Sequence, residues 1–193
     1  MSHERHHRRS IRLPGYDYRE EGAYFVTLCV QGRERLFGHI TDGEMRLNAA
    51  GQIVSDEWLR TPLVRPYVTL DAFVIMPNHL HAILFLDGTK TDEHAGVVGA
   101  TWQVAPTKHA NTENHDRPKG PLAHSLGAIV GQFKRMTTIR INALNATPGV
   151  KIWQRNYYEH IIRNDADLAR IREYIATNPA QWETDALYRP ASD

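Results

Sequence analysis

The stretch that decides the fold of this chain is Phe73-Val-Ile-Met-Pro-Asn-His-Leu-His-Ala-Ile-Leu-Phe-Leu86. It is too hydrophobic for a surface loop, and Pro77-Asn78 divides it into two apolar segments. Proline followed by asparagine is typical of a tight turn. The pattern therefore predicts two adjacent strands, one from Val68 to Met76 and one from His79 to Leu86.

The second of these strands carries two histidines separated by one leucine. Side chains alternate between the faces of a strand, so Leu80 should point into the core while His79 and His81 share the opposite face. Two imidazoles that converge on one place can begin a divalent-metal site. Histidine pairs in strands also commonly make only hydrogen bonds, so the spacing alone leaves both interpretations open.

The composition is that of a globular protein with one domain. The chain has 193 residues, of which 41% are hydrophobic and 23% charged, and it lacks an apolar run of the ~18 residues that a membrane span needs. Cys29 is the single cysteine, which excludes an internal disulfide and a cysteine zinc site. The first ten residues lack the apolar segment of a secretory signal, and we expect a cytoplasmic protein of bacterial type, associated with the nucleoid and with no membrane partner.

The net charge of +1 conceals an uneven distribution. No acidic residue occurs between Arg117 and Tyr158, whereas seven basic ones do, and the first dozen residues are also basic. Segregated positive charge is typical of a surface that binds a polyanion such as nucleic acid. The candidate DNA-binding residues are Arg8, Arg9, Arg12, Lys134, Arg135, Arg140, Arg155 and Arg170. Trp153, Tyr157 and Tyr158 are candidates for stacking on unpaired bases, or alternatively they complete the core.

The remaining elements follow from periodicity and breakers. We expect a basic arm over residues 1–16, one domain over 17–185 with a flexible insertion near 87–120, and a tail over 186–193. Within the domain, the predicted elements are strands at 23–30, 33–38, 44–47 and 151–162 and helices at 48–63, 122–146 and 164–177. This order predicts an α+β fold, a ferredoxin-like antiparallel sheet with helices packed on one face.

The last predicted helix presents two different faces. Leu168, Ile171 and Ile175 form an apolar stripe for the core. Tyr174 and Asn178 follow one turn apart on a polar face, so that a hydroxyl and an amide oxygen can reach the same target. Taken alone, an ordinary surface tyrosine followed by a C-terminal asparagine is the better description.

Read together, the segments Pro77-Asn-His-Leu-His-Ala82 and Tyr174-Ile-Ala-Thr-Asn-Pro179 resemble the single-tyrosine HUH transposases of small bacterial insertion sequences. Within that family the chain looks most like the REP-associated tyrosine transposases. The lead-in Arg8-Arg-Ser-Ile-Arg-Leu-Pro-Gly-Tyr-Asp-Tyr18 and the blocks Gly131-Gln-Phe-Lys-Arg135 and Trp153-Gln-Arg-Asn-Tyr-Tyr-Glu-His-Ile-Ile-Arg163 carry the same resemblance. It extends over roughly residues 8 to 183.

The resemblance implies a role for each matching position. His79 and His81 would hold Mg²⁺ or Mn²⁺, with Asn178 as a third ligand where many relatives have glutamine. Tyr174 would be the nucleophile, with Tyr157 and Tyr158 as rivals. The implied reaction is metal-dependent nicking and joining of single-stranded DNA at hairpins with a short flanking sequence, through a 5′-phosphotyrosine intermediate, by a monomer or a homodimer.

Three alternatives deserve comparison with this interpretation. Histidine-triad nucleotide hydrolases need a third histidine where this chain has Ile83. A replication initiator or relaxase would share the chemistry but is usually larger. A DNA-binding protein that regulates repetitive elements and no longer cleaves them remains the non-enzymatic alternative.

Overall fold

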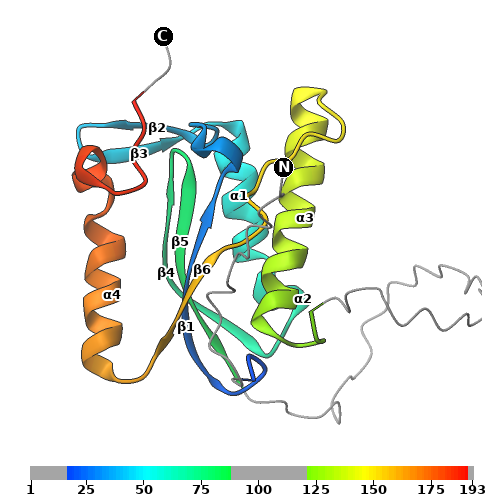
Figure 1. Cartoon of the computed structure of the whole chain (residues 1–193), viewed down its shortest axis with the longest axis vertical. Coiled ribbons are helices and arrows are strands. Elements are labelled where there is room, and N and C mark those ends of the chain that lie inside the picture. The colour runs from blue at the N-terminus through cyan, green and yellow to red at the C-terminus, as the bar shows by residue number, and fades with distance from the viewer. Residues whose placement is uncertain (1–16, 88–120, 191–193) are drawn as a thin grey trace, which may run out of the picture.

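The structure is a computed structural model, and it describes residues 17–87 and 121–190. Its main sheet has four antiparallel strands in the order β4-β5-β1-β6 (Figure 1), which span Val68–Met76, His79–Leu86, Gly22–Cys29 and Tyr158–Ile162. Helix α1 (Ala49–Leu59) precedes β4, and helix α3 (Leu126–Asn145) connects β5 to β6. The order β1-α1-β4-β5-α3-β6 with this pairing is ferredoxin-like, which confirms the predicted α+β fold class.

Strand β5, which carries the two histidines, lies inside the sheet. It pairs with β1 along its whole length, from Gly22 opposite Leu86 to Cys29 opposite His79, and with β4 on its other edge. The turn at Pro77-Asn78 places Met76 directly opposite His79. The two strands predicted from the opening stretch therefore have the bounds that the sequence indicated.

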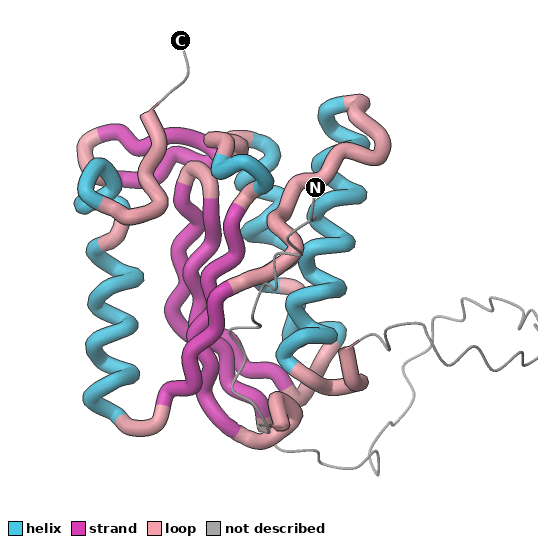
Figure 2. The backbone as a smooth tube through the Cα atoms, viewed as in Figure 1, coloured by secondary structure: helices cyan, strands magenta, loops and turns pink. Residues whose placement is uncertain are grey.

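Two hydrophobic clusters cover the two faces of the sheet. On one face, alternate residues of β5 such as Leu80 and Leu84 join Trp58 of α1 and Phe133 of α3. On the other face, Phe25 and Ile83 pack against helix α4 (Asp165–Thr177). Figures 1 and 2 show α4 alone on one side of the sheet and α1 with α3 on the other.

The position of α4 differs from the prediction that the helices pack on one face of the sheet. Its apolar stripe, which includes Ile171 and Ile175, is buried against sheet residues that point away from α1 and α3. Asn164 caps this helix by accepting a hydrogen bond from the Asp167 N–H, a role for which asparagine is favoured at a helix N-terminus. The packing of α4 on the histidine face of β5 is what brings Tyr174 close to the histidines.

The smaller elements show where the sequence pattern was less accurate. The predicted strand at 33–38 is in fact β2 (Gly38–Thr41), which pairs with β3 (Glu44–Leu47). The predicted helix at 48–63 is divided into α1 and α2 (Thr61–Val64), because a new helical segment begins with Pro62 in its first turn. The predicted strand at 151–162 begins only at Tyr158, and Trp153 makes a single bridge to Val30.

Two short 3₁₀ helices, η1 (Gln31–Arg33) and η2 (Pro179–Thr184), lie at the end of the sheet where the histidines are. Beyond η2, the backbone carbonyls of Ala186 and Arg189 accept hydrogen bonds from Arg33 and Arg35, so this part of the predicted tail lies against the domain. The arm at 1–16 and residues 88–120 of the predicted insertion lie outside the described residues. Among the helices in 17–87 and 121–190, none has the length and apolar character of a membrane span.

Candidate active site

The two histidines of β5 converge on the face of the sheet that α4 covers. His79 and His81 are 0% and 2% exposed, and their ring centroids lie 4.4 Å apart. Leu80, between them, belongs to the cluster on the opposite face. The predicted alternation is therefore confirmed, and the two imidazoles point to one buried place.

Asn78 determines which nitrogen of His79 carries the proton. The Asn78 amide is 1% exposed, and its Nδ2 donates hydrogen bonds to the carbonyl oxygens of Arg33 (3.1 Å) and Leu187 (2.9 Å). Its Oδ1 is therefore an acceptor, and His79 Nδ1–H donates to it at 2.7 Å. The lone pair of His79 is thereby left on Nε2, which is buried and has no hydrogen-bond partner within 17–87 and 121–190.

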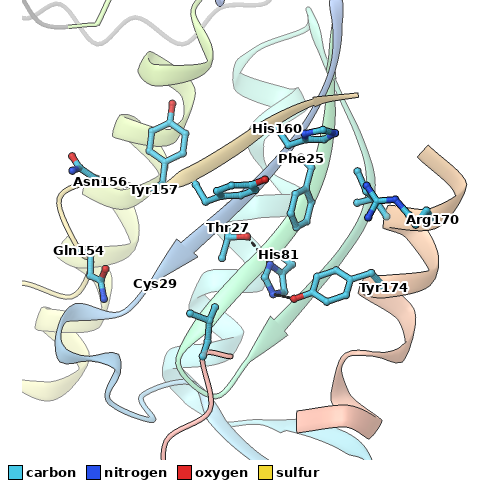
Figure 3. Close-up of a pocket in the computed structure, with 13 residues that line it drawn as sticks. Phe25, Thr27, Cys29, His81, Gln154, Asn156, Tyr157, His160, Arg170 and Tyr174 are labelled. Carbon is cyan, nitrogen blue, oxygen red and sulfur yellow. Dashed lines mark hydrogen bonds between the residues drawn. The ribbon is translucent and has the colours of Figure 1, made fainter. Parts of the chain in front are cut away.

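His81 is held in a similar way between two hydroxyl groups, as Figure 3 shows. Its Nδ1 lies 2.8 Å from Thr27 Oγ1, and its Nε2 lies 3.0 Å from the hydroxyl oxygen of Tyr174. If Nδ1–H donates to Thr27, Nε2 accepts from Tyr174, and both imidazoles present Nε2 to the same place. An outer hydrogen bond that fixes the tautomer is characteristic of metal-binding histidines.

A carboxylate from η2's C-terminal end completes this group. One carboxylate oxygen of Asp185 lies within 4.8 Å of a ring nitrogen of His79 and of a ring nitrogen of His81, and these two nitrogens lie within the same distance of each other. Asn178, which ends α4, donates from Nδ2 to Asp185 Oδ2 at 2.8 Å. Its Oδ1 is buried and has no partner among the residues that the structure describes.

These donors fit a divalent cation. Two imidazole nitrogens, a carboxylate and an amide oxygen form a mixed nitrogen and oxygen set, and oxygen ligands suit Mg²⁺ and Mn²⁺. Two of the buried polar atoms, His79 Nε2 and Asn178 Oδ1, lack a hydrogen bond in the described part of the chain, a state that is costly unless a ligand satisfies them. The structure thus brings the predicted residues His79, His81 and Asn178 together and adds Asp185, which sequence reasoning missed.

The environment sets the protonation of these groups. Burial, with a smaller contribution from Arg33, lowers the pKa of His79 to about 3, and burial together with His79 lowers the pKa of His81 to about 3. Both imidazoles are therefore neutral near pH 7, the form that binds a cation. Burial first, and then the Asp185 carboxylate, raise the pKa of Tyr174 to about 12, so its hydroxyl is protonated without a cation nearby.

Tyr174 differs from the two rival tyrosines in what it contacts. Besides its contact with His81, its hydroxyl lies 3.5 Å from Asp185 Oδ2. The ring of Tyr157 lies 5.4 Å from Lys134 Nζ, and Tyr158 meets the edge of Phe25. Of these three tyrosines, Tyr174 is the one whose hydroxyl has a hydrogen bond to the histidine pair in the described structure.

The predicted DNA-binding residues fall into distinct groups. Arg8, Arg9 and Arg12 lie outside the described residues. Arg135 and Arg155 are exposed, and both line one hollow between α3 and residues 149–155. Arg170 lines a different pocket, next to Tyr174. Arg140 instead forms ion pairs with Glu57 (2.8 Å) and Asp56 (3.5 Å) of α1, and Lys134 donates to two backbone carbonyls.

Of the two roles that the sequence allowed for Trp153, the structure supports packing in the core and not stacking on bases. Its side chain is 6% exposed, its Nε1–H donates to Thr137 Oγ1 at 2.8 Å, and its ring packs against Phe37 and Phe133. Trp153 therefore completes the core between the sheet and α3, the alternative that the sequence also allowed.

Comparison with known proteins identifies relatives at the level of sequence and fold. No family model matches the chain. An uncharacterised protein of Haemophilus influenzae is 42% identical over 183 residues, which cover 95% of this chain and 94% of that protein. A second protein of the same organism, provisionally named a REP-associated tyrosine transposase, is 25% identical over 86% of this chain and 74% of its own length.

A solved structure has the same fold. A REP-associated tyrosine transposase bound to a REP hairpin shares the fold with a TM-score of 0.52 and 20% identity, over 86% of this chain and 71% of that one. The chain therefore belongs to one family with the uncharacterised Haemophilus influenzae protein, and it is similar in sequence to the named REP-associated tyrosine transposase and in fold to the solved one.

Proposed function

We propose that this protein is a transposase that nicks and rejoins single-stranded DNA through a covalent bond between Tyr174 and a 5′-phosphate. The observation that carries the proposal is the position of the Tyr174 hydroxyl, 3.0 Å from His81 Nε2 and 3.5 Å from Asp185 Oδ2. A hydroxyl next to a group of potential metal ligands is the arrangement that nucleophilic attack on a phosphodiester requires.

Each side chain has a role in this scheme. His79, His81, Asp185 and the Asn178 amide oxygen would hold Mg²⁺ or Mn²⁺. The cation, when bound, polarises the phosphoryl oxygens and stabilises a phenolate at neutral pH. Asn78 and Thr27 orient the two imidazoles through their Nδ1 atoms.

The bonds balance without an external energy source. Tyr174 Oη gives its proton to water and forms a bond to phosphorus, the bond from phosphorus to the 3′-oxygen breaks, and that oxygen takes a proton from water. The 5′-phosphotyrosine conserves the phosphodiester bond energy, so a second DNA 3′-hydroxyl can attack it and release Tyr174. We propose that a monomer is active, which is supported by the contact of Tyr174 on α4 with His81 on β5 of the same chain.

For the substrate, we propose single-stranded DNA hairpins with a short flanking sequence. The solved relative is bound to a REP hairpin, which supports this class of DNA. Of the candidate DNA-binding residues in the described part of the chain, three have exposed side chains that can contact phosphates: Arg135, Arg155 and Arg170.

A denaturing gel tests the proposal. The protein is incubated with Mn²⁺ and a labelled pool of single-stranded hairpins with randomised flanks, and we expect a labelled protein band that survives denaturation. Tyr174→Phe should abolish this band, whereas Tyr67→Phe, whose ring packs on His124 far from the site, should retain it. A wild-type protein that binds the pool but forms no such band would contradict the proposal and support the regulator that only binds DNA.

A further inference from the structure

A pocket of about 660 Å³ lies directly beside the histidine and tyrosine group, between β1, β6 and α4 (Figure 3). Its volume is in the range of about 300–1,000 Å³ that is usual for organic ligands. His81 and Tyr174 form part of its lining, so a molecule in the pocket would be next to the proposed nucleophile. None of the roles described above uses the rest of this space.

The floor of the pocket is aromatic. Phe25 is buried and stacks on His81 with 5.5 Å between centroids, and Tyr158 and Tyr174 both meet its ring edge-on at 6.2 Å. Tyr158 is 51% exposed although its ring lines a pocket. An exposed ring above a buried aromatic floor is a surface on which a planar base can stack, whichever of the four bases it is.

The wall opposite α4 carries two amide side chains, Gln154 and Asn156. Gln154 Nε2 donates to the carbonyl oxygen of Val30 at 3.2 Å, and this hydrogen bond fixes the orientation of the Gln154 amide. The Asn156 side chain is exposed. Amides have both a donor and an acceptor, and they can pair with the edge of a base, with adenine as the preferred partner.

Lys134 holds this wall in place. Its Nζ donates to the carbonyl oxygens of Gln154 (2.9 Å) and Asn156 (3.1 Å), and it lies over the ring of Tyr157. Burial lowers the pKa of this amine to about 8. The segment 154–157 is thus fixed on α3 before any ligand arrives, which reduces the entropic cost of binding.

A charged group lies at the α4 side of the pocket. Arg170, one turn before Tyr174, lines the pocket with a side chain that is 69% exposed. One of its nitrogens donates to Asp167 at 2.6 Å, and the guanidinium has further N–H donors. A phosphate is the group that such a guanidinium recognises well.

We infer that this pocket, given the proposed function, binds one unpaired nucleotide next to the scissile phosphate. Its base stacks on Tyr158, the edge of the base faces Asn156 and Gln154, and its phosphate lies toward Arg170. The pocket would then select the base adjacent to the cleaved bond. Lys134 is a positioning residue, because it holds the backbone of Gln154 and Asn156 in place.

Nuclear magnetic resonance on the full chain, with EDTA present so that cleavage cannot occur, tests this inference. The probes are the four single-stranded homotetranucleotides, dA₄, dC₄, dG₄ and dT₄. We expect the side-chain amide signals of Asn156 and Gln154 to shift on titration, with a different Kd for each base. Tyr158→Leu should weaken binding at least fivefold, as expected for the loss of about 1 kcal/mol or more of stacking, while Tyr67→Leu should leave Kd unchanged.

Two outcomes would overturn the inference: shifts confined to residues outside the pocket, or equal Kd values for the wild type and a folded Tyr158→Leu variant. The result is separable from the proposed function. If hairpin DNA forms the Tyr174 adduct but the tetranucleotides leave the pocket signals unchanged, strand cleavage stands and the nucleotide pocket fails. If the pocket binds the tetranucleotides but no adduct forms, the pocket stands and strand cleavage fails.

Discussion

Removal of the Asn78 side chain should weaken metal binding without direct contact with the metal. Asn78 is 1% exposed and makes three side-chain hydrogen bonds, to Arg33, Leu187 and His79. Asn78→Ala removes all three, at about 1 kcal/mol each, so we expect the free energy of unfolding to fall by about 3 kcal/mol. Without this acceptor, His79 is free to place its proton on Nε2, the buried nitrogen that has no hydrogen-bond partner in the described structure.

Loss of such an outer partner typically lowers metal affinity by about 10–100-fold, which corresponds to about 1.4–2.8 kcal/mol. The assay is calorimetric titration of the protein with Mn²⁺, together with urea unfolding to establish that each variant is folded. Asn142→Ala is the matched control, because Asn142 is also buried and donates to the Val150 carbonyl at 2.9 Å, but it lies on α3 away from the histidines. The control should lose stability and keep its Mn²⁺ affinity. A folded Asn78→Ala variant that binds Mn²⁺ as tightly as the wild type would refute the argument.

Three other predictions concern the carboxylate, the basic residues and the glycines. Asp185→Asn keeps the size of the side chain but removes its charge, so we expect Mn²⁺ affinity to fall more than tenfold in calorimetry. The control Glu183→Gln, at an exposed neighbouring position, should change Mn²⁺ affinity little, and equal affinities of Asp185→Asn and the wild type would exclude Asp185 as a ligand. Arg140→Met should lower the free energy of unfolding by about 1.5–3 kcal/mol and leave hairpin affinity unchanged, since it removes the nearer of the two arginines that pair with buried Glu57. The exposed Arg135→Met should do the reverse, and the opposite order in urea unfolding and filter binding would contradict this assignment. Gly131→Ala should stabilise the protein by about 0.5–1 kcal/mol because no described atom lies within 4 Å of the added carbon, whereas Gly51→Ala should destabilise it because that carbon would lie 2.2 Å from the Phe37 oxygen; a stabilising Gly51→Ala would show that α1 packs differently.

The sequence predicted the central elements well because their signals are local. The alternation around Leu80 and the turn at Pro77-Asn78 specify a hairpin with its two histidines on one face, and the structure has that hairpin. The apolar stripe that contains Ile171 and Ile175 specifies α4 in the same way. Both elements depend on period and on turn chemistry, which a short window of sequence contains.

What the sequence did not predict depends on contacts between distant segments. Asp185 comes after Pro179, outside the helical period that links Tyr174 and Asn178, so no spacing rule connects it with His79 and His81. Its carboxylate reaches the group because η2, which follows α4, places Asp185 next to Asn178.

The same limitation applies to the basic residues of α3. Arg140 and Lys134 have the same appearance in the sequence as Arg135, but Arg140 pairs with acids of α1 and Lys134 with the carbonyls of segment 154–156. A basic run predicts a positive surface on average. Which of its members contact the protein itself is determined by tertiary packing.

The central claim is that Tyr174 forms the covalent bond to DNA, and mass spectrometry of the trapped adduct tests it most directly. After reaction with hairpin DNA and Mn²⁺, the adduct is digested with nuclease and protease, and the peptide that retains a nucleotide is sequenced. We predict that the nucleotide is attached through its 5′-phosphate to Tyr174. A nucleotide on Tyr157 or Tyr158 would contradict the account, because neither hydroxyl has a hydrogen bond to the histidine pair in the described structure.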